Sequence, residues 1–390
     1  MLPVAPANLA GAPQRALGHG VAFRPSLLPA RTSTPARTSV RRAATHVLTA
    51  QASASAPSVQ LNGHASRTAT ATTPAQHEAI VLCSCPDAKG VVAAMAQTVF
   101  GYGCNILSSD QYTGARGSKL VEDIPRSETH APCPDLTTGT YFQRIHLDFS
   151  ELSVGVENVA VLEGALRSTA ARFNMTMTVS YRARPQRLAI LVSKLDHCLY
   201  DLLIRNRTGE LGHCELAVVA SNHRDMAPIA AQFGVRFVYL PMEGEDKEAA
   251  KAAQEAKMEA LFAEEKIDLI VLARYMQVLS DGFCERNSSR TINIHHSFLP
   301  AFEGGRPYHR AHERGVKLIG ATAHYATAEL DKGPIIEQDT ERISHRDSVP
   351  TMVRKGKDLE RMVLARAVRA HLDSRVMVFG NRTVVFEENT

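Results

Sequence analysis

Two polar segments of the sequence carry side chains suited to chemistry at a carbonyl group. Residues 293–300 read Asn-Ile-His-His-Ser-Phe-Leu-Pro, and residues 330–335 read Leu-Asp-Lys-Gly-Pro-Ile, shortly after Ala-His-Tyr at 323–325. Each segment alone has a plain structural interpretation, since Asn and His cap strand ends and Leu-Asp-Lys-Gly-Pro is ordinary turn composition. Together, Asn293, His295 and Asp331 supply an amide, an imidazole and a carboxylate, which is the set that addition to a carbonyl requires.

Each of the three groups has a role that its chemistry suggests. An amide donor and a protonated imidazole can stabilise the oxyanion that develops on the carbonyl oxygen. A carboxylate can fix the ionisation of the imidazole and handle a proton of water. We therefore predict a catalytic site at Asn293, His295 and Asp331.

The elements expected around these residues alternate between strands and helices. Short apolar runs at 188–193, 216–221, 237–240, 269–272, 291–294 and 320–325 read as strands, and 198–206, 225–233 and 247–265 read as helices. This alternation predicts a Rossmann-like α/β domain over 188–390, with a mostly parallel sheet covered on both faces. Its active site is expected at the carboxyl ends of strands. Residues 183–187 read as a linker.

A smaller domain is expected over residues 78–182. Strands at 79–84, 105–112, 141–149 and 175–181, with helices at 91–102 and 156–173, give the order β-α-β-β-α-β. That order is typical of a ferredoxin-like sandwich. The polar stretch 115–138 reads as an exposed loop inserted between its second and third strands.

Residues 1–77 have the composition of a targeting segment. They are rich in Ala, Ser, Thr, Pro and Arg, contain seven Arg, and hold no Asp or Glu, the first acid being Glu78. The pattern favours an organelle transit peptide over a disordered linker. The chain's net charge of +4 comes from this tail, because the remainder has 44 − 7 = 37 basic residues against 40 acidic ones, a sum of −3. The charge of the globular part therefore gives no reason to expect nucleic-acid binding.

Composition also excludes other classes. Apolar runs such as 269–273 are far shorter than the roughly 18–20 residues of a membrane helix, so we expect no membrane association. Seven scattered cysteines without a Cys-x-x-Cys pair indicate neither a disulfide framework nor a structural zinc site. The histidines at 295, 296, 309, 312 and 324 match no compact ligand pattern, and we expect no metal and no cofactor.

The chain resembles the folate-dependent formyltransferase family. The resemblance rests on residues 293–302, on the following Gly304, Arg306, Pro307, Tyr308 and His309, and on 315–317, 320–325 and 330–335. Residues 190–203 and 379–383 are similar to the formyltetrahydrofolate deformylases within that family. The region from 78, with Cys-Pro-Asp-Ala-Lys-Gly at 85–90, is similar to the ACT domain that precedes catalysis in those enzymes.

This resemblance implies hydrolysis of 10-formyltetrahydrofolate to formate and tetrahydrofolate, feeding one-carbon and purine metabolism. It implies that Asn293 and His295 bind the formyl oxygen and that Asp331 orients His295 and the attacking water. It also implies a folate-binding loop formed by Met276, Gln277, Val278 and Leu279. His296 and Ser297, which follow His295, are expected to line the same substrate pocket. Gln277 stands where relatives usually have Arg.

Two alternatives to a hydrolase are open. The first is transfer of the formyl group to a small acceptor such as glycinamide ribonucleotide. Related transformylases hold the acceptor's phosphate in a turn Ser-Gly-x-Gly-Ser-Asn, whereas residues 193–198 lack glycine and include Asp196. The basic RNA-binding domain expected of a methionyl-tRNA formyltransferase has no counterpart before Thr390. The second alternative is an inactive amino-acid-sensing protein, which the presence of all three polar residues disfavours.

The resemblance extends to regulation and location. ACT domains pair across subunit interfaces and bind small amino acids near an Asp-x-x-Gly turn, so we expect a homo-oligomer with an effector near Asp87, Lys89 and Gly90. Relatives from photosynthetic eukaryotes imply a mitochondrial location, and the tail suits a plastid nearly as well.

Overall fold

The computed structural model describes residues 76–114, 139–301 and 304–388. The transit-peptide prediction for residues 1–77 falls almost entirely outside these ranges. The loop expected at 115–138 lies outside them as well.

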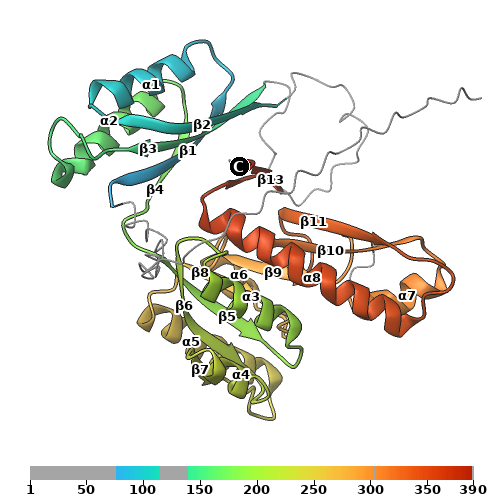
Figure 1. The fold of residues 1–390 in the computed structure, drawn as a ribbon. Helices are drawn as coiled ribbons and strands as arrows, with labels where there is room; N and C mark the ends of the chain where they lie inside the picture. The colour runs from blue at the N-terminus through green and yellow to red at the C-terminus, as the bar shows by residue number, and fades with distance from the viewer. Residues whose placement is uncertain (1–75, 115–138, 302–303, 389–390) are drawn as a thin grey trace, which may run out of the picture. The chain divides into compact units, whose positions relative to one another are not determined.

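The first domain is a four-stranded antiparallel sheet with two helices (Figure 1). Its elements are β1 (Glu78–Pro86), α1 (Val91–Gly101), β2 (Asn105–Thr113), β3 (Thr140–Asp148), the short 3₁₀ turn η2 (Val156–Asn158), α2 (Val159–Ala171) and β4 (Thr176–Tyr181). The strand order β2-β3-β1-β4 is that of a ferredoxin-like sandwich, as the sequence predicts.

Spacing explains how helix α1 covers this sheet. Val91, Met95 and Val99 lie four residues apart, so they share one face of the helix and all are buried. Met95 and Val99 pack with Leu166 of α2 and Val81 of β1 in one apolar core, and Val91 packs beside Tyr141.

The second domain is a seven-stranded mixed sheet in the order β11-β10-β9-β8-β5-β6-β7. Its strands are β5 (Gln186–Val192), β6 (Cys214–Ser221), β7 (Arg236–Tyr239), β8 (Leu269–Leu272), β9 (Thr291–His295), β10 (Leu318–Tyr325) and β11 (Ile335–Arg342). Strands β5 to β9 pair in parallel, β10 runs antiparallel to β9, and β11 runs antiparallel to β10. A mostly parallel α/β sheet is confirmed, with an antiparallel addition at one edge.

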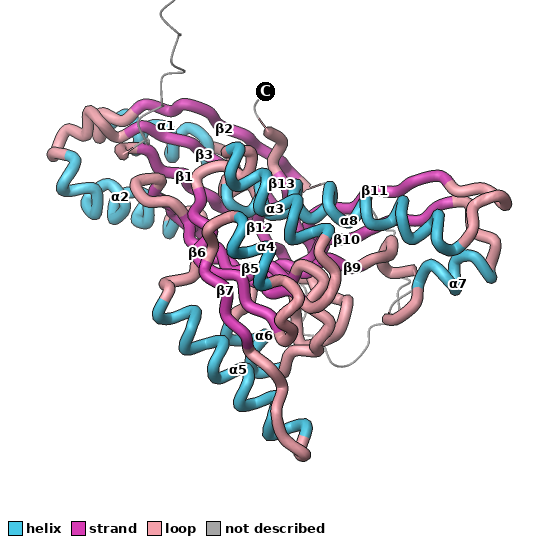
Figure 2. The backbone as a smooth tube through the Cα atoms, turned by 60° about the horizontal axis from the view of Figure 1, so that its bottom comes forward, coloured by secondary structure: helices cyan, strands magenta, loops and turns pink. Residues whose placement is uncertain are grey.

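Helices cover both faces of this sheet, as Figure 2 shows. One face carries α3 (His197–Thr208), α4 (Ala227–Gln232), α7 (Pro307–Glu313) and α8 (Val349–Leu372). The other carries α5 (Lys247–Glu264) and α6 (Asp281–Arg286). A two-stranded hairpin, β12 (Val376–Phe379) and β13 (Arg382–Val385), follows α8. Helices α6, α7 and α8 and strand β11 are elements that the sequence reading did not propose.

Strand β8 shows why a parallel strand reads as a continuous apolar run. Its four residues Leu-Ile-Val-Leu are all buried. Successive side chains point to opposite faces, so Leu269 and Val271 join the core beneath α3 and α8, while Ile270 and Leu272 join the core beneath α5.

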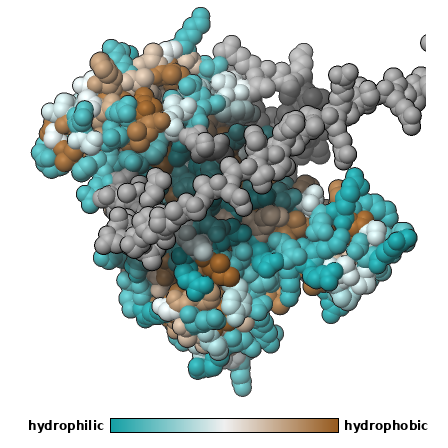
Figure 3. All heavy atoms as spheres, in the orientation of Figure 1, coloured by the Kyte–Doolittle hydropathy of each residue, from teal (hydrophilic) through white to brown (hydrophobic). Residues whose placement is uncertain are grey.

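The surface is mostly polar. Figure 3 shows hydrophilic residues over much of the visible described surface, with apolar residues in small patches. Among the described residues, no helix combines the length and apolar character needed to cross a bilayer.

Candidate active site

The pairing of β9 with β10 places two polar side chains opposite each other. In the antiparallel register, Asn293 faces His324 and His295 faces Thr322. Residues two apart on a strand share a face, so Asn293 and His295 point to the same side of the sheet.

His324 fixes the orientation of the Asn293 amide. Its Nδ1 lies 2.9 Å from the carbonyl oxygen of Tyr325 and donates to it. Burial lowers the pKa of His324, so the ring is neutral and its Nε2 can only accept. Asn293 Nδ2, 3.2 Å from this Nε2, is therefore the donor. Its second N–H bonds to no other group among the described residues and can donate to a substrate.

Asp331 sits against His295. Its Oδ1 lies 3.2 Å from His295 Nδ1 and 4.0 Å from His324 Nε2, and its Oδ2 accepts from the backbone N–H of Gly304 at 3.3 Å. Burial alone would raise the pKa of Asp331, but the hydrogen bond and charge of His295, with the Gly304 amide, outweigh it and lower the pKa. The carboxylate therefore stays ionised at neutral pH.

The loop that carries Asp331 has to fold back to reach His295. Asn293 and His295 lie in the last three residues of β9, and Asp331 follows β10. Because β10 is antiparallel to β9, the chain leaves β10 at the amino end of β9, where Ala326 donates to the carbonyl of Thr291. Asp331 adopts a left-handed backbone (φ 59°) in this return. Gly333 is required there, because a Cβ would overlap the carbonyl oxygen of Tyr325.

One nitrogen of His295 is left open. Nδ1 is engaged by Asp331, whereas Nε2 is buried and has no hydrogen-bond partner within the part of the chain that the structure describes. An unpaired buried polar atom costs about 1–3 kcal/mol, so its presence calls for a functional explanation. Nε2 is the position from which His295 can act on a substrate.

Thr322 supports the segment after β9. Its hydroxyl donates to the carbonyl of Ser297 at 2.8 Å and accepts from the N–H of Leu299 at 3.0 Å. The Ser297 hydroxyl donates to the carbonyl of Ala301 at 2.8 Å. Ser297, expected to line the substrate pocket, thus also shapes this turn.

The expected folate loop follows β8, the neighbour of β9. Met276 and Val278 are 59% and 61% exposed, while Leu279 is buried. Gln277, Val278 and Leu279 line a cavity of about 250 Å³ beside α5, together with Met242, Lys247, Glu248, Lys251, Gln254 and Glu255. Asn293, His295 and Asp331 are not among the residues that line it.

The expected effector residues lie in the other domain, in the turn between β1 and α1. The N–H of Asp87 donates to the carbonyl of Gly139 at 2.7 Å. Lys89 is exposed, and Gly90 precedes α1 with a φ of 91°, which favours glycine.

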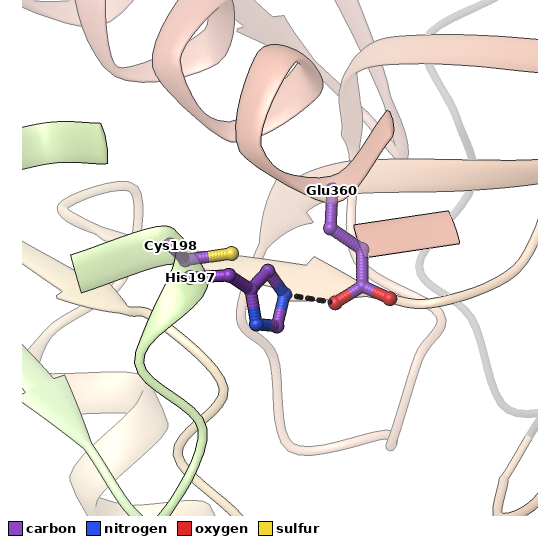
Figure 4. Close-up of side chains that lie close together, drawn as sticks. All are labelled: His197, Cys198 and Glu360. Atoms are coloured by element: carbon purple, nitrogen blue, oxygen red, sulfur yellow. Dashed lines mark hydrogen bonds and ion pairs between the residues drawn. The ribbon is translucent and has the colours of Figure 1, made fainter. Parts of the chain in front are cut away.

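A second polar cluster, which we call the Glu360 cluster, consists of His197, Arg274, Tyr308 and Glu360. His197 Nε2 lies 2.8 Å from Glu360 Oε2, the Tyr308 hydroxyl donates to Oε1 at 2.8 Å, and Arg274 Nε lies 3.4 Å from Oε2 (Figure 4 shows His197 and Glu360). Burial would raise the pKa of Glu360, but His197, Arg274 and Tyr308 outweigh it and lower the pKa.

The same region offers three potential metal ligands. His197, Cys198 and Glu360 have ligand atoms within 4.8 Å of one another (Figure 4). However, Glu360 already accepts from Tyr308 and pairs with the Arg274 guanidinium, which supplies a positive charge to this carboxylate. We interpret the group as a buried ion-pair cluster.

Comparisons with known proteins show which family the chain is similar to. Residues 186–368 match the formyl transferase family. Solved formyltetrahydrofolate deformylases from Pseudomonas syringae pv. tomato and Burkholderia mallei are 38% and 40% identical, with TM-scores of 0.69 and 0.67; each alignment covers 80% of this chain and 94% and 100% of theirs. The fold and site thus define a protein of the formyl transferase class.

The curated relatives are more specific. The formyltetrahydrofolate deformylase of Synechocystis is 46% identical over 79% of this chain and 98% of its own length. That of Bacillus subtilis is 42% identical over 78% of this chain and 93% of its own. The chain belongs to the formyltetrahydrofolate deformylase family.

Proposed function

We propose that this chain hydrolyses 10-formyltetrahydrofolate to formate and tetrahydrofolate. The observation that carries the proposal is the open Nε2 of His295, held by an ionised Asp331 beside an amide with a free N–H. Membership of the deformylase family supports the choice of substrate.

In the proposed reaction, water attacks the formyl carbon and the carbonyl oxygen becomes an oxyanion. Asn293 Nδ2 and a proton on His295 Nε2 donate to that oxygen, while Asp331 keeps the imidazole in place through Nδ1. The proton that leaves the attacking water is returned to N10 of the folate as the carbon–nitrogen bond breaks. Formic acid then loses its proton to solvent.

Replacement of Asp331 by Asn tests this mechanism. Asn keeps the size of the side chain but removes its charge, so we expect formate release to fall by about 10²–10⁴-fold. Release is measured with the purified full chain and 10-formyltetrahydrofolate. Asp339→Asn, at an exposed ion pair with Arg366, serves as the control. No release by the unmodified chain would sink the hydrolase assignment, and full release by Asp331→Asn would sink the role of Asp331.

Water is the proposed acceptor, and no metal or cofactor is proposed. Support comes from the 193–198 segment, in which Ser193 accepts from the N–H of Met276 and donates to Asn222, so its hydroxyl is already engaged. Appearance of formylated glycinamide ribonucleotide in an assay that contains it would favour the transferase alternative. Activity that a chelator abolishes would require a metal.

For the first domain we propose an ACT domain that binds a small amino acid near Asp87, Lys89 and Gly90 and pairs in a homo-oligomer. The ferredoxin-like strand order and the exposed turn support this. Size-exclusion chromatography and calorimetric titration with amino acids test it. A monomer that binds none would contradict both parts.

For location we propose an organelle, the mitochondrion first and the plastid as the alternative. The acid-free, Arg-containing composition of residues 1–77 supports the proposal. A fluorescent protein fused after residue 77 provides the test, and diffuse fluorescence would contradict it.

A further inference from the structure

The Glu360 cluster has no part in the mechanism above, yet it is deeply buried. Its members come from α3, the segment after β8, α7 and α8, and their exposures are 9% for His197, 9% for Arg274, 6% for Tyr308 and 2% for Glu360. Buried ion pairs lose hydration and are therefore weak evidence for stability alone. Stability alone therefore does not explain why these four residues form a buried cluster.

The backbone is adapted in two places to admit this cluster. Arg274 adopts a left-handed conformation (φ 62°), which is unfavourable for a non-glycine residue. On α8, one turn before Glu360, a Cβ at Gly356 would overlap the hydroxyl of Tyr308. Glycine in a helix interior is also unfavourable. The approach of Tyr308 to Glu360 therefore lowers the stability of the fold, and a functional benefit of this contact would explain it.

Ring contacts connect the cluster to the active site. The Tyr308 ring lies edge-on to His296, with centroids 6.0 Å apart and planes at 71°. His296 in turn lies edge-on to His295, at 5.2 Å and 66°. Burial, with the charge of Arg274 next in importance, lowers the pKa of His296 to about 3. His296 is therefore neutral at pH 7, with one ring nitrogen able to accept a hydrogen bond.

We propose that His296 binds and orients the attacking water, and that Glu360 is a positioning residue that fixes His296 through Tyr308 and Arg274. The inference rests on the hydrolysis proposed above. Water has two protons: if Asp331 accepts one and His296 the other, the oxygen lone pair is directed at the formyl carbon. As the carbon–oxygen bond forms, one water proton passes to the Asp331 carboxylate, which gives it to N10 as the carbon–nitrogen bond breaks.

The first test separates kcat from KM in the full chain with 10-formyltetrahydrofolate. We expect His296→Ala to lower kcat by about 10²-fold. Glu360→Gln and Tyr308→Phe should lower it by about tenfold, with KM changed by less than about twofold. His296→Gln, which keeps an acceptor, should recover part of the loss. Asp268→Asn, at the Arg184 ion pair on the amino side of β8, is the matched control.

The second test replaces water by hydroxylamine, which forms formhydroxamate and tetrahydrofolate. In this reaction the hydroxylamine nitrogen bonds to the formyl carbon, the bond to N10 breaks, and one proton of that nitrogen passes to N10. Because this stronger nucleophile needs less orientation than water, His296→Ala should retain formhydroxamate formation while its formate release falls. Reactions without protein give the background.

The outcomes separate the two proposals. Undiminished formate release by His296→Ala overturns this inference and leaves the hydrolase assignment standing. Equal loss of formate and formhydroxamate also overturns it, since His296 would then support the whole site. No formate from the unmodified chain overturns the hydrolase assignment and this inference with it. If thermal melting shows that Glu360→Gln does not fold, His296→Gln and Tyr308→Phe decide the test.

Discussion

The second domain holds two buried histidine–carboxylate pairs that differ in what surrounds the carboxylate. Asp331 contacts His295 and a backbone amide, and within the described ranges no Arg or Lys pairs with it. Glu360 contacts His197 at 2.8 Å, accepts from Tyr308 and pairs with Arg274. The comparison teaches that a carboxylate matched by a guanidinium holds structure, whereas one left with an imidazole can act on a substrate.

The supports of the two carboxylates differ in the same sense. Asp331 lies in a left-handed turn of a loop, and Glu360 lies inside the long helix α8. A loop allows a side chain to approach a substrate, while a helix packed on a sheet keeps its side chain in one place. The first pair therefore belongs to the reaction and the second to its framework.

After Asp331→Asn, the largest expected effect on the first pair comes from His295→Asn. Loss of a donor to the oxyanion should lower kcat by about 10²–10³-fold, measured as formate release. The free energy of unfolding in urea should fall by less than in Glu360→Ala. The contact of Nδ1 with Asp331 is lost, but Asp331 keeps the Gly304 amide, and Nε2 has no partner to lose among the described residues. A large loss of stability with activity retained would reverse the roles of the two pairs.

The next effect is on stability. Glu360→Ala leaves Arg274 buried without a carboxylate, so the free energy of unfolding should fall by about 3–5 kcal/mol in urea titration. Asp339→Ala breaks an exposed pair with Arg366 and should cost less than about 1 kcal/mol. Equal losses in the two variants would show that the buried Glu360 cluster contributes no more to the free energy of unfolding than an exposed ion pair does.

The smallest expected effect is a dependence of stability on pH, which differs between buried histidines and buried carboxylates. Burial lowers the pKa of His371 to about 4. In the unfolded chain this histidine therefore binds a proton below about pH 6.5, whereas in the folded chain it stays neutral down to about pH 4. Stability should therefore fall as pH drops from about 6.5 to 4, by on the order of 1–3 kcal/mol. The lowered pKa values of Asp331 and Glu360 stabilise the fold above about pH 4, and that contribution is lost only at more acidic pH.

Urea titrations at several pH values measure this dependence. His371→Gln should reduce the slope between pH 6.5 and 4 without removing it, because the pKa values of His296 and His324 are lowered as well. His309→Gln, at an exposed position, should leave the curve unchanged. Identical curves for both variants would contradict the assignment to His371.

Local patterns predicted much of the fold. Residues 269–272 are a strand because four apolar residues suit burial on both faces, and the structure gives the same bounds. The helix expected at 247–265 ends one residue earlier, at Glu264. Helix α8 was not proposed, although Ser348 caps it and Pro follows in its first turn, which was a readable start signal.

The site was predicted only in part, for reasons of distance along the chain. His295 and Asp331 stood out because each lies in a dense polar motif after a strand, and the structure brings them together. His324 belongs to the same polar motif as Asp331, but it lies in the expected strand. Its role depends on the antiparallel register that places it opposite Asn293. His197 and Glu360 are 163 residues apart, so no local pattern connects them.

Helix α8 has a consequence for the order in which the protein becomes active. It covers one face of β9, β10 and β11 and carries Glu360. A ribosome makes the chain from its amino end, so Asn293, His295 and Asp331 emerge while the apolar face of their strands still lacks its cover. We expect the nascent chain to hold all three catalytic side chains and yet release no formate until residues 349–372 have been made.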